Sequence, residues 1–549
     1  MKQEMNTSDN FKDLPGFSDL FIDFIGRQPF FKERFRMNQQ LFYSSEILSE
    51  RADSFERRDV LCGAIKETMQ NVVLSESQER NLKNLCNNKT LATITGQQVG
   101  FLGGPLYTLF KAMSAIRLAE QLENEYKTSN ANLNFVPVFW IEDNDHDSLE
   151  ASKISIIDSK NEPCDFYASS SKQSGDRKTV SNLELRNDIA DEIEKLTSAL
   201  PETPFKEELV QKIKHIYAPG KSWRDAFVEL MQYILADTGI LFLSASLLRR
   251  SGVWSDLVKK ELESIGTSTS LVNLANTILD INGYHIQAKT SDINLFYHEN
   301  GERLKIEENS NESQKYRIGE KEYHYKELRE LAEEHPERFS PNVLLRPVFQ
   351  DFAIPTIAYI SGPSEIGYAS QIRELYKFFD VFMPAFIPRH SATILSPRVK
   401  RFLKSSKLDQ KYFMRPWQEI EAELAGEIAD ADIENAIDHA EKHIDEDLKK
   451  IESEIGRIDK NYEQSVRAVK AKIDKLMDQL RKKAISAQKK QKSDEFAKYR
   501  QANSLIYPGG TLQERYISPV YFINQMGLEE FKEKLTELTF LESNRHWYL

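Results

Sequence analysis

Hydrophobic and polar positions along the chain predict alternating strands and helices in its first and central parts. Apolar residues recur near the helical period of 3.6 over residues 106–118 and 223–236. Buried strands are expected where β-branched and apolar residues run together, at residues 90–95, 134–142 and 239–246, at the start of 356–379 and within 381–395. Strands that alternate with helices are typical of parallel βαβ units. We therefore predict an α/β fold with a doubly wound parallel sheet.

Two regions depart from this pattern. Between residues 247 and 355, the stretches INGYHIQAKTSDINLFYHENGERLKIEE and QKYRIGEKEYHY alternate in short runs and contain Asn-Gly turns, which is typical of antiparallel strands. We interpret this region as an insertion, or two insertions, in the α/β core. Residues 151–222 are a second and weaker candidate for an insertion.

Residues 417–505 contain no proline and show the apolar spacing of a coiled coil. Residues 419–455 hold 14 acidic and 3 basic side chains, whereas residues 464–500 hold 4 acidic and 12 basic ones. We expect the acidic helix to fold back on the basic helix, with a turn near residues 456–461. The apolar phase continues through Gly456, however, as it would in a single rod. Either form leaves an apolar seam that favours a partner chain.

These patterns divide the chain into six predicted parts. They are an N-terminal helical region (1–88), the first half of the core (89–246, with the insertion at about 151–222), a mostly antiparallel insertion (247–355), the second half of the core (356–416), a coiled-coil helical hairpin (417–505) and a C-terminal segment that returns to the core (506–549).

The composition of the chain argues against several classes of protein. A chain of 549 residues is too long for one core, and a net charge of -12 argues against a nucleic-acid partner. Three cysteines without a CxxC pair provide no disulfide framework, which points to a reducing compartment. The polar N-terminus resembles no secretory signal, and no apolar run is long enough to span a membrane. We expect a cytoplasmic protein.

The first candidate site follows the strand at residues 90–95. The stretch TITGQQVGFLGGPLYTLFKA has the glycines of a phosphate loop but neither GxxxxGK[ST] nor GxGxxG. A helix N-terminus after a parallel strand favours an anion. The glycines could equally form a turn that only packs tightly. The candidate residues here are Gly96, Gln97, Gln98, Gly100, Gly104, Tyr107 and Lys111.

The second candidate is the acidic cluster FWIEDNDHDSLEAS, which follows the strand at residues 134–142. Clustered carboxylates raise one another's pKa and need a metal or cationic groups beside them. The spacing matches no standard zinc signature, so we predict no metal and favour a substrate ammonium or sugar hydroxyls, with a helix cap as the remaining reading. The residues chosen are Trp140, Asp143, Asp145, His146 and Asp147, with His146 as the best acid–base candidate.

Further candidates lie in four later loops. LLRPVFQD contributes Arg346, and SGPSEIGYASQ contributes Glu365 and Tyr368. PRHSAT offers Arg389, His390 and Ser391 for a phosphate, and YPGGTLQER offers Gly509 and Gly510. An ordinary loop or a helix stop would also explain the second and last of these. No Ser-His-Asp order or HExxH motif appears, so neither a nucleophilic triad nor a zincin mechanism is supported.

In their order along the chain, these blocks resemble the cysteine-adding enzymes of bacillithiol biosynthesis, the BshC family. The resemblance runs from about residue 14 to the C-terminus and implies a Rossmann-like core related to class I synthetases and nucleotidylyltransferases, with connecting-peptide insertions. It further implies a homodimer carried by the coiled-coil arm. The implied reaction is a ligation that adds L-cysteine to the amine of glucosaminyl-malate. The chain lacks the HxGH-type signature of the synthetase group at Gly104–Tyr107.

Roles follow from the residues and the resemblance together. Asp143, Asp145, His146 and Lys111 are the predicted catalytic residues. Gly96, Gln97, Gln98, Gly100, Gly104, Tyr107, Trp140, Asp147, Arg346, Glu365 and Tyr368 are predicted to bind substrate. Arg389, His390, Ser391, Gly509 and Gly510 are predicted to bind a nucleotide, with ATP and Mg²⁺ as the expected activating pair. The alternatives are a metal-dependent transferase or hydrolase that uses Asp143, Asp145 and His146, and a non-enzymatic coiled-coil scaffold.

Overall fold

The computed structural model forms two compact units. The larger unit comprises Asn6–Ile394 with Thr511–Leu549, and the smaller one contains Leu395–Gly510. The described residues are 7–34, 44–87, 89–127, 133–145, 151–168, 178–309, 314–428, 431–458, 463–491 and 493–549. The six-part division made from the sequence stays a prediction.

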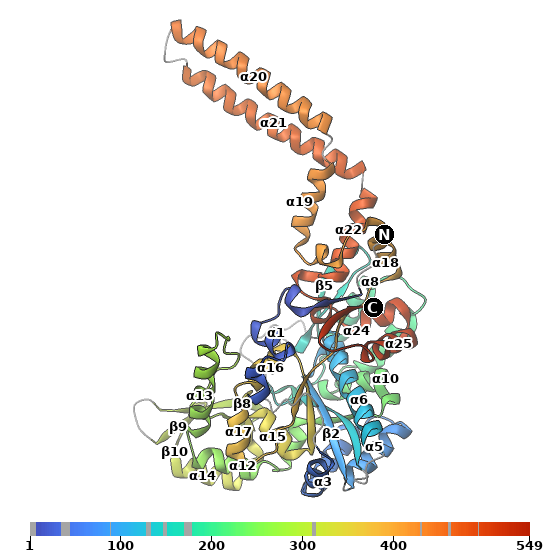
Figure 1. Ribbon diagram of the computed structural model, residues 1–549, viewed down its shortest axis with the longest axis vertical. Helices are drawn as coiled ribbons and strands as arrows, with labels where there is room; N and C mark the ends of the chain where they lie inside the picture. The colour runs from blue at the N-terminus through green and yellow to red at the C-terminus, as the bar shows by residue number, and fades with distance from the viewer. Residues whose placement is uncertain are drawn as a thin grey trace. The chain divides into compact units, whose positions relative to one another are not determined.

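A five-stranded parallel sheet forms the core of the larger unit (Figure 1). Its strand order is β13-β12-β2-β3-β6, which confirms the predicted Rossmann-like α/β fold. The strands are β2 (Thr90–Gln98), β3 (Asn134–Glu142), β6 (Leu241–Ser244), β12 (Thr356–Ser361) and β13 (Ala385–Pro388). Most of their residues are buried, as expected for a parallel sheet covered on both faces, although the edge strand β13 is largely half-buried.

The register of β2 and β3 fixes which loops meet. Gly96 lies beside Trp140, and Gln98 lies beside Glu142, so the last residues of the two strands are neighbours. The carboxyl ends of β12 and β13 reach the same edge, where Ser361 pairs with Pro388. This edge is where ligands bind in open α/β sheets.

Helix α6 (Tyr107–Tyr126) follows β2 and packs on β2, β3 and β12. Its apolar residues recur at helical spacing, and Ala115, Leu118 and Leu122 pack into a core cluster with Leu91 and Phe135. Burial of this stripe holds the first turn of α6, with Tyr107, close to the end of β2.

The other helices of the larger unit surround the sheets (Figure 1). They are α1 (Asp19–Ile25), α2 (Pro29–Arg34), α3 (Ser45–Asp53), α4 (Arg58–Thr68), α5 (Glu76–Cys86), α8 (Ile189–Ala199), α9 (Lys206–Ile216), α10 (Trp223–Leu235), α11 (Ala245–Arg250), α12 (Ser255–Glu263), α13 (Thr267–Ile281), α14 (Tyr325–Glu334), α15 (Arg346–Ala353), α16 (Pro363–Ala369), α17 (Arg373–Phe379), α23 (Gln513–Tyr516), α24 (Pro519–Met526) and α25 (Leu528–Thr539).

The structure corrects the reading of the cysteines. Cys62 on α4 and Cys86 on α5 form a disulfide, whereas Cys164 is free. Because the two partners are 24 residues apart, their proximity depends on the packing of α4 against α5, which the spacing of the cysteines does not reveal.

An antiparallel sheet with the order β10-β9-β8-β7-β11 occupies part of the predicted insertion. Asn300 and Gly301, both with positive φ, form the turn between β7 and β8 as predicted. The earlier Asn-Gly pair was misread, because Asn282 caps the end of α13 and no strand includes residues 281–289. The strands are β7 (Leu295–Glu299), β8 (Glu302–Glu308), β9 (Lys315–Ile318), β10 (Lys321–His324) and β11 (Phe339–Pro341).

Two small sheets complete the larger unit. One has the order β1-β15-β14 and joins the two ends of the unit to the segment after β13. The other is the antiparallel pair β4 and β5. Their strands are β1 (Ser8–Asn10), β14 (Ser391–Thr393), β15 (Arg545–Tyr548), β4 (Lys153–Ile157) and β5 (Pro163–Tyr167).

The smaller unit is helical, and its long helices form an antiparallel hairpin. Arg467 pairs with Glu452, Lys470 with Asp445, and Arg481 with Asp438 and Glu441. These pairs join the acidic helix to the basic one and confirm the hairpin over the rod. Residues 459–461 of the expected turn lie outside the described residues. The helices are α18 (Pro397–Ser406), α19 (Trp417–Ile428), α20 (Ala431–Ile458), α21 (Glu463–Gln491) and α22 (Ser493–Ile506). Within the described part of the chain, no helix has the length and apolar character needed to cross a membrane.

Candidate functional site

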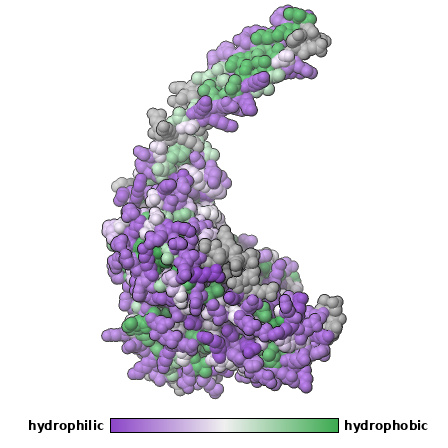
Figure 2. All heavy atoms as spheres, turned by 180° about the vertical axis from the view of Figure 1, so that it is seen from behind, coloured by the Kyte–Doolittle hydropathy of each residue, from purple (hydrophilic) through white to green (hydrophobic). Residues whose placement is uncertain are grey.

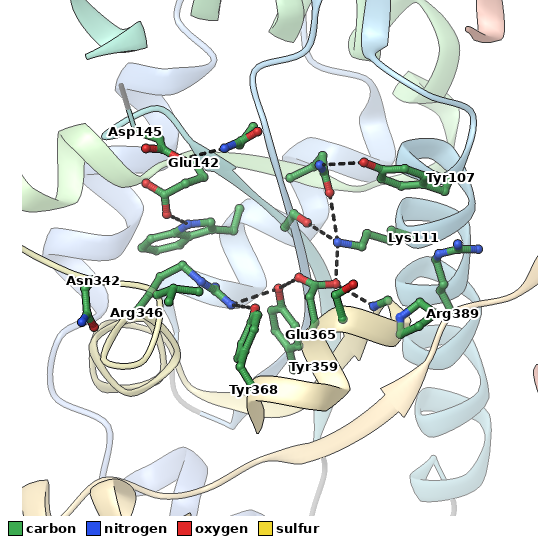
Figure 3. A pocket seen from close by; sticks show the side chains of 18 of the residues that line it. Tyr107, Lys111, Glu142, Asp145, Asn342, Arg346, Tyr359, Glu365, Tyr368 and Arg389 are labelled. Atoms are coloured by element: carbon green, nitrogen blue, oxygen red, sulfur yellow. Dashed lines mark hydrogen bonds and ion pairs between the residues drawn. The ribbon is translucent and has the colours of Figure 1, made fainter. Parts of the chain in front are cut away.

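A cavity of about 520 Å³ opens at the carboxyl ends of the parallel strands (Figure 3). Its walls come from the ends of β2, β3 and β12, the first turns of α6, α15 and α16, and the antiparallel insertion. The predicted residues that line it are Gly96, Gln97, Gln98, Tyr107, Lys111, Trp140, Asp145, Arg346, Glu365, Tyr368 and Arg389. The structure therefore brings most of the predicted substrate residues together.

Lys111 connects three parts of the cavity wall (Figure 3). Its Nζ donates to the backbone oxygen of Gly96 at 2.9 Å and to Gln97 Oε1 at 3.0 Å, and lies 2.5 Å from Glu365 Oε2. Tyr107 lies one helical turn before Lys111 on the same face of α6, and its hydroxyl accepts from Gln97 Nε2 at 3.3 Å. The spacing of four residues explains why both side chains reach the end of β2.

Glu365 is held in its ionised form by the first turn of α16. One carboxylate oxygen accepts from the Gly362 N–H at 2.6 Å, and the other accepts from the Tyr359 hydroxyl at 2.6 Å. Burial alone would raise the pKa of Glu365, but the charges of Lys111 and Arg346 lower it below its usual value.

Arg346 lies at the start of α15 on the opposite wall. Its guanidinium donates to the Tyr368 hydroxyl and to Gln350 Oε1, each at 2.7 Å. These acceptors are neutral, and no described carboxylate forms an ion pair with Arg346, although its charge acts on the nearby Glu365 and Glu142. Arg346 is therefore a candidate to bind an anion in the cavity. This contact also accounts for the position of Tyr368.

Glu142, the last residue of β3, faces the cavity beside Trp140. The indole Nε1 of Trp140 donates to Glu142 Oε2 at 3.0 Å. Burial raises the pKa of Glu142, although Trp140, Arg303 and Arg346 oppose this effect. A carboxylate at a cavity wall with a raised pKa is a stronger base than an ordinary one, which makes Glu142 a candidate general base.

Asp145 and Asp143 have different environments although they are two residues apart. Asp145 lines the cavity, accepts from Gln98 Nε2 at 2.7 Å and lies 3.2 Å from Arg303 Nη1. Asp143 is fully buried outside the cavity lining. It accepts from Ser244 Oγ and from the N–H and Oγ of Ser246 at 2.7–2.8 Å.

The predicted catalytic role of Asp143 does not agree with this position, because its carboxylate caps the first turn of α11. The alternative of a metal-dependent transferase or hydrolase also relied on Asp143, which is not available as a ligand in the cavity. Among the described residues, no three His, Cys, Asp or Glu side chains are grouped as metal ligands. His146 and Asp147 lie outside the described residues, so their roles stay predictions.

Three of the predicted nucleotide residues, Arg389, His390 and Ser391, are engaged in contacts within the larger unit. Arg389 Nη2 donates to the buried Glu514 at 2.6 Å, and Ser391 Oγ donates to the same carboxylate at 2.7 Å. His390 is buried against Ser114 and the backbone oxygen of Leu541. Of the three, only Arg389 lines the cavity.

Gly509 and Gly510 belong to the smaller unit, in the turn that follows α22. Because Arg389, His390 and Ser391 belong to the larger unit, a nucleotide pocket formed by the five residues stays a prediction.

Gly100 and Gly104 line a second, smaller cavity of about 230 Å³. It shares Gln97, Gln98, Tyr107 and Arg515 with the first cavity. The predicted glycine loop thus contributes to two adjoining spaces at the end of β2.

Several residues that line the first cavity were not predicted from the sequence. Arg303 comes from β8 of the insertion, Asn342 follows β11, and Tyr359 lies within β12. No local motif marks these residues, because long-range packing brings them to the sheet edge. Arg515 stands in the quoted YPGGTLQER motif, where only the glycines were chosen.

The family models and the curated relatives that match this chain all belong to the same family. The model of the N-terminal Rossmann-like domain of the bacillithiol biosynthesis protein BshC matches residues 3–390, and that of its C-terminal coiled-coil domain matches residues 392–549. A protein named "Putative cysteine ligase BshC" from Chloroherpeton thalassium is 31% identical over 529 residues, with 93% of this chain and 92% of the relative covered. Proteins of the same name from Chlorobium phaeobacteroides (30% identical, 93% of each chain) and Bacillus cytotoxicus (26% identical, 89% and 90%) also match.

Proposed function

Because this chain belongs to the BshC family of bacillithiol biosynthesis, we propose that it is a cysteine ligase that joins L-cysteine to the amine of glucosaminyl-malate through an amide bond. The cavity at the carboxyl ends of β2, β3 and β12 is the proposed active site. The name of the relatives supports the ligase activity, and the resemblance of the sequence motifs supports the amino-sugar substrate.

One observation in the structure supports this chemistry most directly: Glu142, with a raised pKa, faces a cavity that also exposes Arg303 and Arg346. An amine attacks a carbonyl only after it loses the proton of its ammonium form, so a ligase of this kind needs a base beside the amine. The two arginines suit the carboxylates of a malate group. A base and cationic side chains thus line the same cavity.

The carboxylates and amides divide the cavity into two proposed halves. Asp145 and Glu142 suit the ammonium of the cysteine or the amine of the sugar, and Gln97 and Gln98 suit sugar hydroxyls. Arg346, with Tyr368, suits a carboxylate. Glu365 keeps Lys111 in position, so we assign Lys111 to orientation of the Gln97 amide and stabilisation of nearby negative charge.

Amide formation from a free carboxyl group requires activation of that group, and we propose ATP with Mg²⁺ as the activating pair. This part of the proposal rests on the chemistry of amide formation. The residues first chosen for the nucleotide do not support it, because Ser391 and Arg389 are engaged with Glu514.

We also propose a homodimer formed by the helical hairpin. Apolar side chains gather along the hairpin surface (Figure 2). Ile451, Val469, Leu476 and Leu480 are 47–61% exposed, and Ile458 is 87% exposed. Apolar side chains at coiled-coil spacing are normally covered by another helix, and a second copy of the chain would supply one.

Product formation tests the function. Purified protein would be incubated with L-cysteine and glucosaminyl-malate, with and without ATP and Mg²⁺, and the products measured by mass spectrometry. We expect a cysteinyl amide of glucosaminyl-malate that requires ATP. A folded protein that forms no adduct under any of these conditions contradicts the proposal.

A further inference from the structure

We propose that the second cavity is an oxyanion subsite, built from Arg515, Thr108 and the N-terminal end of α6, that binds a phosphate or carboxylate group. It adjoins the first cavity at the end of β2. The subsite rests on the proposed function only for the identity of the anion, which would be a phosphate of the activating nucleotide or a carboxylate of the acid substrate.

The charge of this cavity distinguishes it from the first one. Glu142, Asp145 and Glu365 line the first cavity, whereas no described residue that lines the second is acidic. Lys153 lines only the second cavity, and Arg515 lies where the two cavities adjoin and lines both. The smaller space therefore has the more one-sided positive lining.

Arg515 supplies the positive charge that remains after internal pairing. Lys153 is paired with Asp165 at 2.8 Å. The backbone N–H of Arg515 donates to the Leu512 oxygen, but its guanidinium makes neither a hydrogen bond nor an ion pair with the residues that the structure describes. The guanidinium lies 5.9 Å from the centre of the Phe17 ring. A half-buried guanidinium with no carboxylate partner is a strong binding group for an oxyanion.

Thr108 provides an independent observation in the same space. Its side chain is fully buried, and its Oγ1 has no hydrogen-bond partner in the described part of the chain. A buried hydroxyl without a partner is costly, and a bound acceptor would satisfy it. Thr108 lines the second cavity and not the first.

Few atoms surround Gly104 on the side that lies near this hydroxyl. A methyl group added at Gly104 would lie 3.5 Å from Thr108 Oγ1, and its only other neighbour within 4 Å would be the Cα of Gly100. At Gly100, an added methyl group would come within 2.7 Å of the Gly104 backbone. The absence of side chains at both positions thus allows the backbone to fold tightly and leaves space beside Thr108.

The helix adds a favourable field to these groups. Helix α6 contains 20 residues and begins at Tyr107, one residue before Thr108. Its positive end favours a negative charge within the first turn. The second cavity is therefore lined by three groups that each favour an anion: the Arg515 guanidinium, the Thr108 hydroxyl and the N-terminal end of α6.

Titration calorimetry with two probes tests the subsite and identifies the source of the anion. Inorganic pyrophosphate represents the nucleotide phosphates, and malate represents the acid substrate. Thr108→Val removes the hydroxyl at nearly constant volume, and Arg515→Met removes the charge. Arg346→Met is the matched control, because Arg346 lines only the first cavity. Neither probe needs turnover, so this result is independent of ligase activity.

We expect the full-length protein to bind one probe, with affinity reduced about tenfold or more by Thr108→Val and by Arg515→Met. Pyrophosphate as that probe would assign the subsite to a phosphate, and malate would assign it to a carboxylate. Binding that only Arg346→Met weakens would place the anion in the first cavity and overturn the proposal. Absence of binding of both probes to the folded protein would also overturn it.

Discussion

Lys111 Nζ lies 2.5 Å from Glu365 Oε2, and both side chains are largely buried at the edge of the parallel sheet. Replacement of Lys111 by Met would leave the Glu365 carboxylate without its main partner. We expect this substitution to lower the free energy of unfolding by about 3–5 kcal/mol, as found when one partner of a buried pair is removed. Urea denaturation of the purified variant measures this change.

Two further variants separate the charge effect from lost packing. The double variant Lys111→Met with Glu365→Gln should regain a large part of the loss, because no buried charge remains unpaired. Lys377→Met, which breaks an exposed pair with Glu374, should cost less than about 1 kcal/mol. A Lys111→Met variant as stable as Lys377→Met would show that the pair has little structural importance.

The raised pKa of Asp351 leads us to expect that the free energy of unfolding falls as the pH rises. Burial raises its pKa to about 6 from an ordinary 3.8, although the Tyr376 hydroxyl and the Gln350 amide donate to it. A raised carboxyl pKa means that the folded protein holds this proton more tightly than the unfolded chain does. Stability from this group is therefore present below pH 4 and lost between pH 4 and 6.

The variant Asp351→Asn should remove this dependence. Its free energy of unfolding, relative to the parent protein, should rise by up to about 3 kcal/mol between pH 4 and 6, as a shift of two pKa units implies. Unfolding at a series of pH values measures the difference, with Asp280→Asn as an exposed control. A constant difference across this window would refute the assignment.

The lowered pKa of His546 leads us to expect the opposite dependence of stability on pH. It is fully buried between Ser391 and Thr393, and burial lowers its pKa to about 4 from 6.5. The unfolded chain then binds a proton that the folded protein rejects, so stability falls as the pH drops from 6.5 to 4. His546→Gln should remove about 3 kcal/mol of this loss.

Acid unfolding of the two proteins, followed by circular dichroism, checks this expectation. His443→Gln, an exposed substitution on α20, is the control and should leave the acid transition unchanged. Starting from its stability at pH 7, His546→Gln should lose less stability on acidification than the parent protein does, and so should unfold at a lower pH. Coincident transitions would mean that His546 does not limit acid stability.

The dimer proposal predicts a change in mass when the apolar seam of the hairpin is interrupted. Leu476 and Leu480, both on α21, are 61% and 51% exposed. Glutamate at both positions should convert the dimer into a monomer of 63.5 kDa, because charged groups at a coiled-coil seam oppose association. Light scattering during gel filtration measures the mass. Lys475→Glu is the control and should remain dimeric; a double leucine variant that also stays dimeric would exclude this seam.

Local patterns predicted much of the fold. The strand at 134–142 and the helix from Trp223 follow directly from runs of apolar residues and from helical periodicity, which need no knowledge of distant contacts. The division of charge between the two long helices predicted the hairpin in the same way. Periodicity did not reveal the pairing of Cys62 with Cys86, because it depends on helix packing.

Only those residues of the site that belong to a recognisable local motif could be predicted from the sequence. Gln97, Lys111 and Glu365 were found because they lie at or after the ends of parallel strands, and these ends meet at one edge of the sheet. Arg303 was missed because it reaches that edge from an inserted sheet. Asp143 was overvalued because its sequence does not show that its side chain turns toward Ser244 and Ser246 instead of the cavity.

The central claim is that the cavity beside Glu142 forms the amide bond. The most direct measurement is the rate of cysteinyl-amide formation by Glu142→Gln at saturating substrates, compared with the parent protein and an Asp256→Asn control. We predict a rate at least about 100-fold lower, with unchanged urea unfolding, because the variant cannot accept the amine proton. A folded Glu142→Gln variant that forms product within about threefold of the parent rate would contradict the assignment.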